Sequence, residues 1–591
     1  MQQKAHDLFC RIFMDARMKD QKVLISKCEN DEHCDVDQVI LDNFSDLDIS
    51  KSVCLSSDFH RDIEFDSVFR HLDQTELKGS SHILRQLFEC PSNDVGLLRK
   101  RQECLKEFGE HDDREFQKLK ELESSVLWAL TEPEEGISDL FNMMYFKLAL
   151  MKKLNGCPEV LTGVNLYKII FSPLVGILAP VIYFIVPYLV IWYSFGINIS
   201  FRSYIKLLFT TMMNSGVVFG MAPKFKLVQG ASYLLSMIFY FTGLFNSVEI
   251  AKTLYKVGRH LCGKVDKIAE FLKVSVEVIG KHWTEKMGDA FGGAVGCLSI
   301  EEELAYVRTL SFGPFKLLSN FGKHLVAYKS LHVSTLKSIL KKVYVIDCVR
   351  ALGAMRNKFN YGYTEYMTAE QPNMKLSGLR HPCIADAVPN DVSMGGKVPN
   401  NIIITGTNAG GKSVTIKGIL INALMSQTCG VSCCDACAMT VFDSINAQIN
   451  VPDSTGHESL FEAEMHRCKA TLDGLRDNSG KNLVVMDEIF SSTNPLEAIC
   501  GAYAVCNKIA SFKNSMLIFT THYNYLTKLS KLGGFVNYKM ETLVGNDTIE
   551  FTYKLVRGVN KHHLALELLK RNGFDQDIID AALAVKKKIS A

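Results

Sequence analysis

The chain has 591 residues, enough for about three or four domains, and 47% of them are hydrophobic, which excludes an intrinsically disordered protein. Its 66 basic and 64 acidic residues nearly cancel, so a global attraction to nucleic acid is excluded and any DNA contact would need a local patch. The 18 cysteines have no regular spacing and residues 1–7 are polar rather than signal-like, so we expect reduced thiols that face the cytosol.

Residues 1–58 form a variable N-terminal segment to which we assign no chemistry. Their most acidic part, residues 28–37, includes Cys, His, Asp and Glu side chains but has no ordered spacing of metal ligands. A solvated loop or linker accounts for this composition.

Two uncharged runs occupy the middle of the chain. Residues 169–201 and 227–248 are runs of 33 and 22 residues without a charged side chain or a histidine. A helix needs about 20 apolar residues to cross a bilayer, so both runs are long enough. Pro173, Pro180 and Pro187 would kink a helix, which membrane helices tolerate better than soluble ones. The runs favour a transmembrane hairpin over the alternative, a buried hairpin of a soluble protein.

The stretch between the two runs, residues 207–223, is also uncharged. Its 17 residues make it marginal as a span, so a re-entrant or interfacial segment is an alternative. Lysine and arginine flank these stretches on both sides, so the positive-inside rule does not decide their orientation.

A glycine-rich loop follows an apolar strand near residue 405. Residues 401–405 read Asn-Ile-Ile-Ile-Thr, and an apolar helix follows the loop. Backbone N–H groups of such a loop can surround phosphates, its lysine can reach the outer ones, and its serine hydroxyl can hold Mg²⁺. A chance glycine turn is the alternative, but it does not explain the strand and the helix. We therefore expect ATP or GTP to bind at Gly406, Thr407, Asn408, Ala409, Gly410, Gly411, Lys412 and Ser413.

Four cysteines fall within nine residues, at positions 429, 433, 434 and 437. Structural zinc sites usually combine two separated pairs of ligands, and a second pair is missing near this cluster. We therefore favour small buried residues over a metal site.

Two further apolar strands end in polar side chains. Residues 483–486 read as a buried parallel strand and lead into Asp487, which is placed to orient Mg²⁺, and Glu488, which is placed as the general base for the attacking water. Residues 516–520 lead to His522, which can sense the γ-phosphate. The order of these elements after a phosphate-binding loop indicates an ATPase.

The nucleotide loop also decides the expected orientation. ATP is cytoplasmic, so the soluble parts on both sides of the uncharged runs should face the cytoplasm. An even number of crossings follows, most simply two, and membrane lipid is then a partner.

These motifs resemble the ATPase domain of the MutS mismatch-repair family, a branch of the ABC-type ATPases. The resemblance rests on residues 406–413, Met486-Asp-Glu-Ile489 and Phe519-Thr-Thr-His-Tyr523. It extends to the helical core, or lever, of that family at residues 72–75, 84–102 and 343–361, and to the start of the ATPase domain at residues 380–391.

The resemblance implies a homodimer that closes over ATP and Mg²⁺. In that family a signature serine completes the site of the other subunit, and the matching residue here is Ser459. The family has glycine two residues before this serine, where this chain has His457. Thr493-Asn494 is similar to the dimer loop of membrane-bound MutS-like proteins, and residues 558–582 resemble the helical dimerisation tail.

In that family a mismatch-reading domain precedes the core, and we do not expect it within residues 1–58 of this sequence. Uncharged runs also replace the basic clamp that would follow DNA phosphates. Direct mismatch reading is therefore not expected, DNA remains a possible partner without support from the net charge, and a protein partner is left open.

We predict an α/β P-loop ATPase domain of the ABC type, preceded by an all-α lever or core domain that a transmembrane helical hairpin interrupts. The alternative is a soluble, DNA-binding repair or recombination factor. The expected domains are the N-terminal segment 1–58, the first core part 59–165, the hydrophobic region 166–250, the returning lever helices 251–370, the ATPase domain 371–555 and the tail 556–591.

Overall fold

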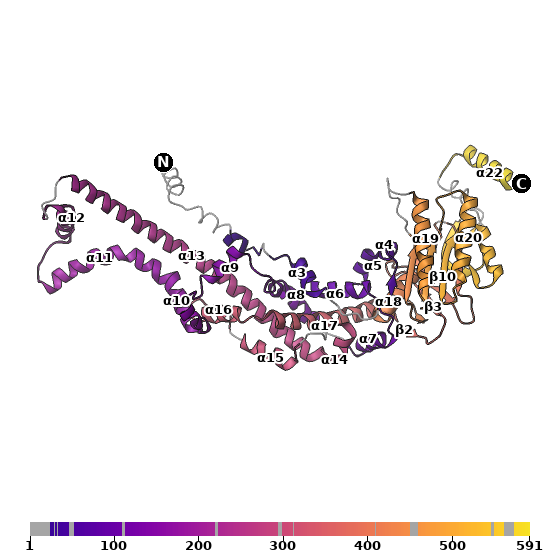
Figure 1. The fold of residues 1–591 in the computed structure, drawn as a ribbon, viewed down its shortest axis with the longest axis horizontal. Helices are drawn as coiled ribbons and strands as arrows, with labels where there is room; N and C mark the ends of the chain where they lie inside the picture. Colours follow the sequence, from indigo (N-terminus) through magenta and orange to yellow (C-terminus); the bar gives the residue numbers. More distant parts are fainter. Residues whose placement is uncertain are drawn as a thin grey trace. The chain divides into compact units, whose positions relative to one another are not determined.

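The computed structural model describes twelve stretches of the chain (Figure 1): 24–28, 30–31, 34–45, 52–108, 113–218, 223–292, 298–310, 313–407, 409–449, 459–544, 549–560 and 573–590. Within them, the side chains of residues 183, 209, 211–234, 544, 549 and 586–590 are not described. The chain forms two compact units. Unit 1 contains residues 1–43, 118–277 and 298–340, and unit 2 contains residues 44–117, 278–297 and 341–591.

A seven-stranded sheet forms the centre of unit 2. Its strand order is β1-β8-β9-β10-β5-β11-β12, and all neighbouring strands are parallel except β11 and β12. In that order the strands are Cys54–Leu55, Ser444–Gln448, Asn482–Asp487, Ser515–Thr521, Asn401–Thr405, Phe535–Val544 and Ile549–Arg557. Strands β5 and β10 are buried along their whole length, as expected for a parallel sheet with both faces covered.

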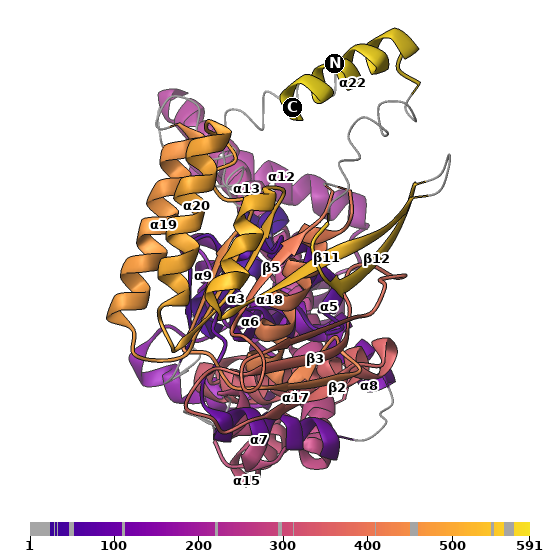
Figure 2. The same ribbon diagram turned by 90° about the vertical axis from the view of Figure 1, so that its right-hand side faces the viewer.

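Three helices follow strands of this sheet: α18 (Lys412–Cys429), α19 (Leu460–Asp477) and α20 (Pro495–Ala510). Apolar side chains of α19 and α20 pack with Ile403 of β5, Val484 of β9 and Phe519 of β10 in one buried cluster. Figure 2 shows α19 and α20 side by side next to the sheet. This sandwich of sheet and helices is the mixed α/β fold that the sequence predicts.

A second sheet of unit 2 has the order β4-β3-β7-β2-β6. In that order its strands are Asn390–Met394, Met374–Leu379, Ala436–Met439, Gly362–Tyr366 and Val431–Ser432. The 3-10 helix η3 (Asn524–Leu532) and the C-terminal helix α22 (Gln576–Ser590) complete this part of the unit. The four cysteines at 429, 433, 434 and 437 are buried in this region, which confirms that they are core residues.

The helical part of unit 2 joins segments that are distant in the sequence. It contains α4 (Phe59–Asp62), α5 (Phe65–Leu72), α6 (Lys78–Glu89), α7 (Val95–Glu107), α14 (Glu285–Phe291) and the second part of α17 (Val333–Phe359). The helix α7 begins after Asp94, whose carboxylate accepts hydrogen bonds from the backbone N–H groups of Gly96 and Leu97.

A buried ion pair connects α17 to the start of α6. The carboxylate of Asp347 is fully buried and accepts hydrogen bonds from Glu76 N at 3.0 Å and Leu77 N at 3.1 Å. Arg350 Nε donates to Asp347 at 2.9 Å, and Arg350 Nη2 donates to the carbonyl of Gln74 at 2.9 Å. Burial raises the pKa of Asp347, although Arg350 and the N–H donors oppose this shift. The two sequence segments that resemble the lever domain therefore meet at one network.

A second buried junction connects α7 to α18. Arg101 is fully buried, and its guanidinium donates to the carbonyls of Thr428 and, at 2.8 Å, Ala290. Gln102 Nε2 donates to the carbonyls of Thr364 at 2.7 Å and Gly430 at 2.8 Å. The bonds to Thr428 and Gly430 satisfy carbonyls at the C-terminal end of α18, where no N–H group of the helix is available, and the bonds to Ala290 and Thr364 add α14 and β2 to the junction.

Unit 1 is helical. Besides the parts of α8 (Asp113–Trp128), α13 (Pro223–His282) and α17 that belong to it, the unit contains α3 (Val36–Phe44), α9 (Glu135–Asn142), η1 (Ala149–Gly156), α10 (Pro158–Leu166), η2 (Tyr167–Phe171), α11 (Ser172–Ser194), α12 (Phe201–Val218), α15 (Ile300–Thr309) and α16 (Phe321–Lys329). Helices α8, α13 and α17 each continue into unit 2.

The two predicted spans differ in how far the structure describes them. The first, 169–201, is helical to Ser194 and then ends near Gly196, which has a left-handed φ of +64°. The second, 227–248, lies in the first half of α13, and the side chains of residues 227–234 are outside the described part. Among the described residues, one helical segment, Pro158–Ile182, is long and apolar enough to cross a membrane, where the sequence predicts two.

The apolar parts of α11 and α13 lie side by side. The hydroxyls of Ser172 and Ser247 are 3.1 Å apart, and Tyr240 donates a hydrogen bond to the carbonyl of Gly176. A Cβ atom at Gly176 would lie 2.9 Å from Leu244, so the small residue permits this close approach. The beginning of α11 therefore pairs with the end of the apolar part of α13, in an antiparallel hairpin.

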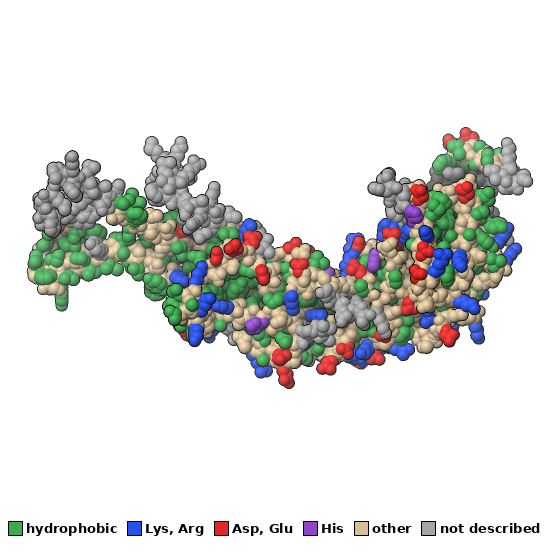
Figure 3. All heavy atoms as spheres, viewed as in Figure 1, with side chains coloured by type: hydrophobic (Ala, Val, Ile, Leu, Met, Phe, Trp, Pro, Cys, Tyr) green, Lys and Arg blue, Asp and Glu red, His purple; other side chains and the backbone are tan. Residues whose placement is uncertain are grey.

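The outer surface of this hairpin is apolar. Figure 3 shows hydrophobic side chains gathered over α11. On α11 the exposed fraction is 37 to 86% for Leu174, Val175, Ile177, Leu178, Val181, Ile182, Ile185, Val186, Leu189, Val190, Trp192 and Tyr193. On α13 it is 41 to 68% for Leu235, Met237, Phe239, Phe241, Phe245 and Ile250. Helices of a soluble core would bury these side chains.

Candidate active site

The glycine-rich loop connects the central strand β5 to the helix α18. Gly411 immediately precedes α18 with a φ of +93°, and a Cβ atom there would lie 3.2 Å from the ring of Tyr553. The N–H of Gly410 donates to the carbonyl of Thr407 at 3.0 Å, which closes the turn. Only glycine adopts the φ of +93° found at Gly411 without strain. Asn408, which the sequence assigns to the same loop, lies outside the described residues.

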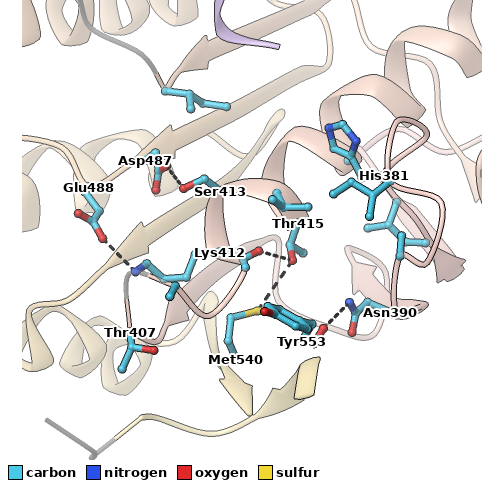
Figure 4. Close-up of a pocket in the computed structure, with 18 of the residues that line it drawn as sticks. His381, Asn390, Thr407, Lys412, Ser413, Thr415, Asp487, Glu488, Met540 and Tyr553 are labelled. Atoms are coloured by element: carbon cyan, nitrogen blue, oxygen red, sulfur yellow. Dashed lines mark hydrogen bonds and ion pairs between the residues drawn. The ribbon is translucent and has the colours of Figure 1, made fainter. Parts of the chain in front are cut away.

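Lys412 points into the site from the first turn of α18. Its side chain is 3% exposed, and Nζ donates to the carbonyl of Gly406 at 3.0 Å. The same Nζ lies 3.0 Å from Glu488 Oε1 (Figure 4). The predicted phosphate-binding lysine and the predicted base therefore form an ion pair in this structure.

Ser413 and Asp487 meet at the carboxyl ends of the strands. Ser413 Oγ donates to Asp487 Oδ2 at 2.5 Å, and Thr520 Oγ1 donates to the other carboxylate oxygen. Residues Thr520 and Asp487 are partners in the register of β10 and β9, so the parallel pairing brings them together. A hydroxyl and a carboxylate oxygen are ligands that Mg²⁺ prefers, so these residues fit the predicted magnesium site. Thr520 was not predicted.

Glu488 is held by its backbone, by Lys412 and by His522. Its φ is +44°, in the left-handed region that a residue with a side chain seldom adopts, and its N–H donates to the carbonyl of Thr520 at 3.3 Å. His522 Nδ1 lies 3.6 Å from Glu488 Oε2. The nearby His522 side chain, together with Lys412, lowers the pKa of Glu488 to about 2 against the opposing effect of burial. Glu488 is therefore ionised, as a general base must be.

These residues line a cavity of about 820 Å³, within the range of small-molecule sites. Of the predicted residues, the lining includes Thr407, Ala409, Gly411, Lys412, Ser413, Asp487 and Glu488. The hydroxyl of Thr407 is buried and has no hydrogen-bond partner among the described residues, so a bound polar ligand could satisfy it. The size, the glycine-rich backbone and the oxygen ligands together fit a magnesium–nucleotide complex.

Sequence reasoning missed part of the lining: His381, Asn390, Met540 and Tyr553 (Figure 4). His381 and Asn390 lie within segments that resemble the start of the ATPase domain, which was the available signal. Asn390 Nδ2 donates to the carbonyl of Tyr553 at 3.0 Å, which ties β4 to β12 at the edge of the cavity. Burial lowers the pKa of His381. For Tyr553 and Met540 the sequence contains no signal, because β11 and β12 place them there.

Of the predicted residues that the structure describes, Gly406, Gly410, Ser459 and His522 are not in the cavity lining, although Leu460, next to Ser459, is. Ser459 is exposed at the start of α19 and forms a capping box, in which Ser459 Oγ accepts from Glu462 N at 3.3 Å. Farther along the same helix, Glu464 lines the cavity and accepts a hydrogen bond from Ser492 at 3.0 Å. Burial raises the pKa of Glu464.

A central parallel strand, a glycine-rich turn and a helix that begins with Lys-Ser define the P-loop class of α/β domains. Residues 402–590 match the family MutS domain V. This region of the chain is therefore a MutS domain V.

Three relatives illustrate the two kinds of protein that this region resembles. An "Endonuclease MutS2" of Exiguobacterium sibiricum is 32% identical over 249 residues, which cover 40% of this chain and 30% of the relative. A "DNA mismatch repair protein MutS" of Pseudothermotoga lettingae is 29% identical over 231 residues, 38% of this chain and 28% of the relative. An "Endonuclease MutS2" of Leuconostoc mesenteroides is 35% identical over 220 residues, 36% of this chain and 26% of the relative. The chain thus covers less than a third of the length of these relatives.

Proposed function

We propose that the chain is a magnesium-dependent ATPase of the MutS family that works as a homodimer and transmits the ATPase cycle to a membrane. The observation that carries the ATPase proposal is that Lys412, Ser413, Asp487 and Glu488 converge on one cavity. They come from the start of α18 and the end of β9, and each side chain has the chemistry that one part of phosphoryl transfer to water requires.

Each residue has one task in the proposed reaction. Backbone N–H groups of the loop and Lys412 bind the phosphates, while Ser413 and Asp487 hold Mg²⁺, which would neutralise charge on the phosphate oxygens. Glu488 accepts a proton from the attacking water, and His522 orients the carboxylate through the contact at 3.6 Å. Because Lys412 now pairs with Glu488 at 3.0 Å, phosphate binding must compete with this pair and would free the carboxylate for the water.

Two surfaces support a dimer. Ser459 is exposed and lies next to Leu460, which lines the cavity, so its hydroxyl is accessible to a second subunit. Near the C-terminus, Phe574 and, on α22, Ile578, Leu583 and Val585 are 40 to 53% exposed, an apolar surface that a second copy could cover.

The proposed coupling begins at α18. This helix starts at the phosphate-binding lysine and ends at the carbonyls that Arg101 and Gln102 bind. A movement of α18 on nucleotide binding would therefore act directly on α7. The helices α8, α13 and α17 belong to both units, so they are covalent routes toward the apolar hairpin.

The membrane proposal rests on the exposed apolar surface of α11 and α13. Only 11% of the most apolar window of Pro158–Ile182 is buried, whereas the core helix of a soluble protein would be mostly buried. We propose that this hairpin inserts into a bilayer and that the ATPase domain faces the cytoplasm. The names of the relatives favour a second candidate, a soluble factor that acts on DNA in repair.

Carbonate extraction separates these candidates. Membranes from cells that produce the full chain should keep it in the pellet at alkaline pH if the hairpin is inserted. Release of the protein into the supernatant, together with salt-dependent binding to duplex DNA, would favour the soluble repair factor. ATP hydrolysis by the purified full chain in detergent, and its loss when Mg²⁺ is chelated, tests the ATPase proposal independently.

A further inference from the structure

A cavity in unit 1, about 690 Å³ in volume, has a predominantly basic lining. Six of its side chains are lysine, arginine or histidine, and all of them come from α13: Lys252, Lys256, Arg259, His260, Lys264 and Lys267. Asp31 is the acidic residue of this lining.

The spacing of these residues places them on one side of the helix. Positions separated by three or four residues share a helix face, and the six basic residues follow this spacing along four turns. Between them, Leu254, Val257, Leu261, Val265 and Ile268 are at most 1% exposed. The helix therefore buries an apolar face in the unit and directs a basic face outward.

Acidic side chains neutralise only part of this basic face. Asp31 pairs with Lys264 and, at 3.2 Å, with His260, and Glu249 pairs with Lys252 at 2.8 Å. Within the described part of the chain, Lys256, Arg259 and Lys267 have no acidic partner within 4.0 Å, and all three are exposed. An anion with several oxygens would find donors there.

The basic face directly follows the apolar part of the same helix. Ile250 is the last exposed apolar side chain of that part, and Lys252, Lys256 and Arg259 follow within about 14 Å along the helix axis. The contact between Ser172 and Ser247 places the beginning of α11 at the same level. A bilayer has a polar layer of about 5 to 8 Å outside its hydrocarbon core, and lysine and arginine side chains can extend along the helix to reach it.

We propose that this basic cavity binds the phosphates of anionic phospholipids and so fixes the depth of the hairpin in the membrane. The proposal rests on the proposed insertion of α11 and α13. Near an anionic membrane surface each lysine or arginine contributes about fivefold to binding, so three of them together contribute about 100-fold.

The test compares a triple variant with a matched single variant of the full chain in nonionic detergent. The triple variant is Lys252→Gln, Lys256→Gln and Arg259→Gln. The matched variant is Lys273→Gln, because Lys273 is an exposed lysine of the same helix about 34 Å beyond Ile250. Binding of dioleoyl phosphatidylglycerol and of dioleoyl phosphatidylcholine is titrated by native mass spectrometry.

We expect the triple variant to lose about 100-fold in affinity for phosphatidylglycerol, while phosphatidylcholine binding stays unchanged and Lys273→Gln behaves like the unaltered chain. Equal phosphatidylglycerol binding by the triple variant and the unaltered chain would overturn the proposal. So would a triple variant that loses affinity for duplex DNA but keeps its lipid affinity, because the basic face would then bind nucleic acid.

Carbonate extraction distinguishes a failure of the proposed membrane insertion from a failure of the proposed headgroup site. The triple variant retains the apolar helices, so it should stay in the membrane pellet. If the unaltered chain is released by carbonate, the proposed insertion fails. If both proteins stay in the pellet and bind phosphatidylglycerol equally, only the headgroup site fails.

Discussion

Replacing Glu488 by glutamine removes one negative charge from the cavity and keeps the shape of the side chain. In the structure the carboxylate of Glu488 forms an ion pair with Lys412, and the pKa of Glu488 is lowered to about 2. A glutamine at this position cannot take a proton from water at neutral pH. General base catalysis contributes about 10²- to 10⁴-fold, so kcat for ATP hydrolysis should fall by that factor.

The affinity of Glu488→Gln for ATP should rise. Lys412 must leave Glu488 to bind a phosphate, and its bond to a neutral amide is weaker than its bond to a carboxylate. The difference between a charged and a neutral hydrogen bond is about 1 kcal/mol, so the Kd for ATP should be about fivefold lower in Glu488→Gln. Single-turnover hydrolysis and equilibrium binding of ATP by the full chain measure the two quantities.

Glu365→Gln is the matched control, because Glu365 is an exposed glutamate of β2 outside the cavity. It should leave kcat and Kd unchanged. Hydrolysis by Glu488→Gln at the rate of the unaltered chain would refute the assignment of Glu488 as the base. A Kd that rises more than about tenfold would show that Glu488 organises the loop instead of competing with phosphate.

The remaining predictions concern binding, assembly, stability and pH. Lys412→Ala removes a charged hydrogen bond to phosphate, so the Kd for ATP should rise about 10- to 150-fold, whereas Lys417→Ala, one turn farther along α18, should leave it unchanged. Equal amounts of inactive Lys412→Ala and Ser459→Ala chains, mixed under exchange conditions, should recover about a quarter of the activity, because each mixed dimer holds one intact site; no recovery would contradict a shared site. Asp347→Ala removes the buried one of the two carboxylates that pair with Arg350, the other being Asp113 at 2.9 Å, and should cost about 3 kcal/mol in denaturant unfolding, while Asp473→Ala on the surface of α19 should cost less than about 0.5 kcal/mol. The pKa of Glu488 lies below the ordinary 4.5, so its ionised form stabilises the nucleotide-free protein above pH 4.5, and this contribution disappears as the pH falls towards 2. The difference in Tm between the unaltered chain and Glu488→Gln should therefore narrow between pH 4.5 and pH 2. A constant difference would count against the ion pairs of Glu488.

The linear order of motifs predicted which of the candidate site residues lie near one another. Parallel strands end at the same edge of a sheet, so Lys412 after β5, Asp487 and Glu488 at β9 and His522 after β10 had to lie near one another. The pairing of Lys412 with Glu488 could not be predicted in this way. It depends on side-chain rotamers and on the left-handed backbone of Glu488, which the surrounding structure imposes.

Residues that complete the cavity from other strands were not predictable. Tyr553 reaches the glycine loop because β12 pairs antiparallel with β11 at the edge of the sheet. Thr520 reaches Asp487 because their strands pair in one particular register. A single sequence does not specify either pairing, since pairing depends on contacts between segments that are far apart.

The uncharged runs also show that the sequence predicted the type of structure but not where it ends. Their composition alone predicted helices that can lie in a bilayer, because composition determines which solvent a helix surface prefers. It predicted an end at residue 201, but α11 ends at Ser194, where the backbone turns at Gly196.

By itself, the sequence determined the local chemistry of this protein: a glycine loop with Lys412 and Ser413, two carboxylates after a buried strand, and an uncharged middle region. These features depend on neighbouring residues and on composition. The tertiary structure decided which distant groups meet: Lys412 with Glu488, Arg101 with the end of α18, and Ser172 of α11 with Ser247 of α13. These contacts form only when strands and helices pack, because each joins residues whose separation along the chain says nothing about their distance in space.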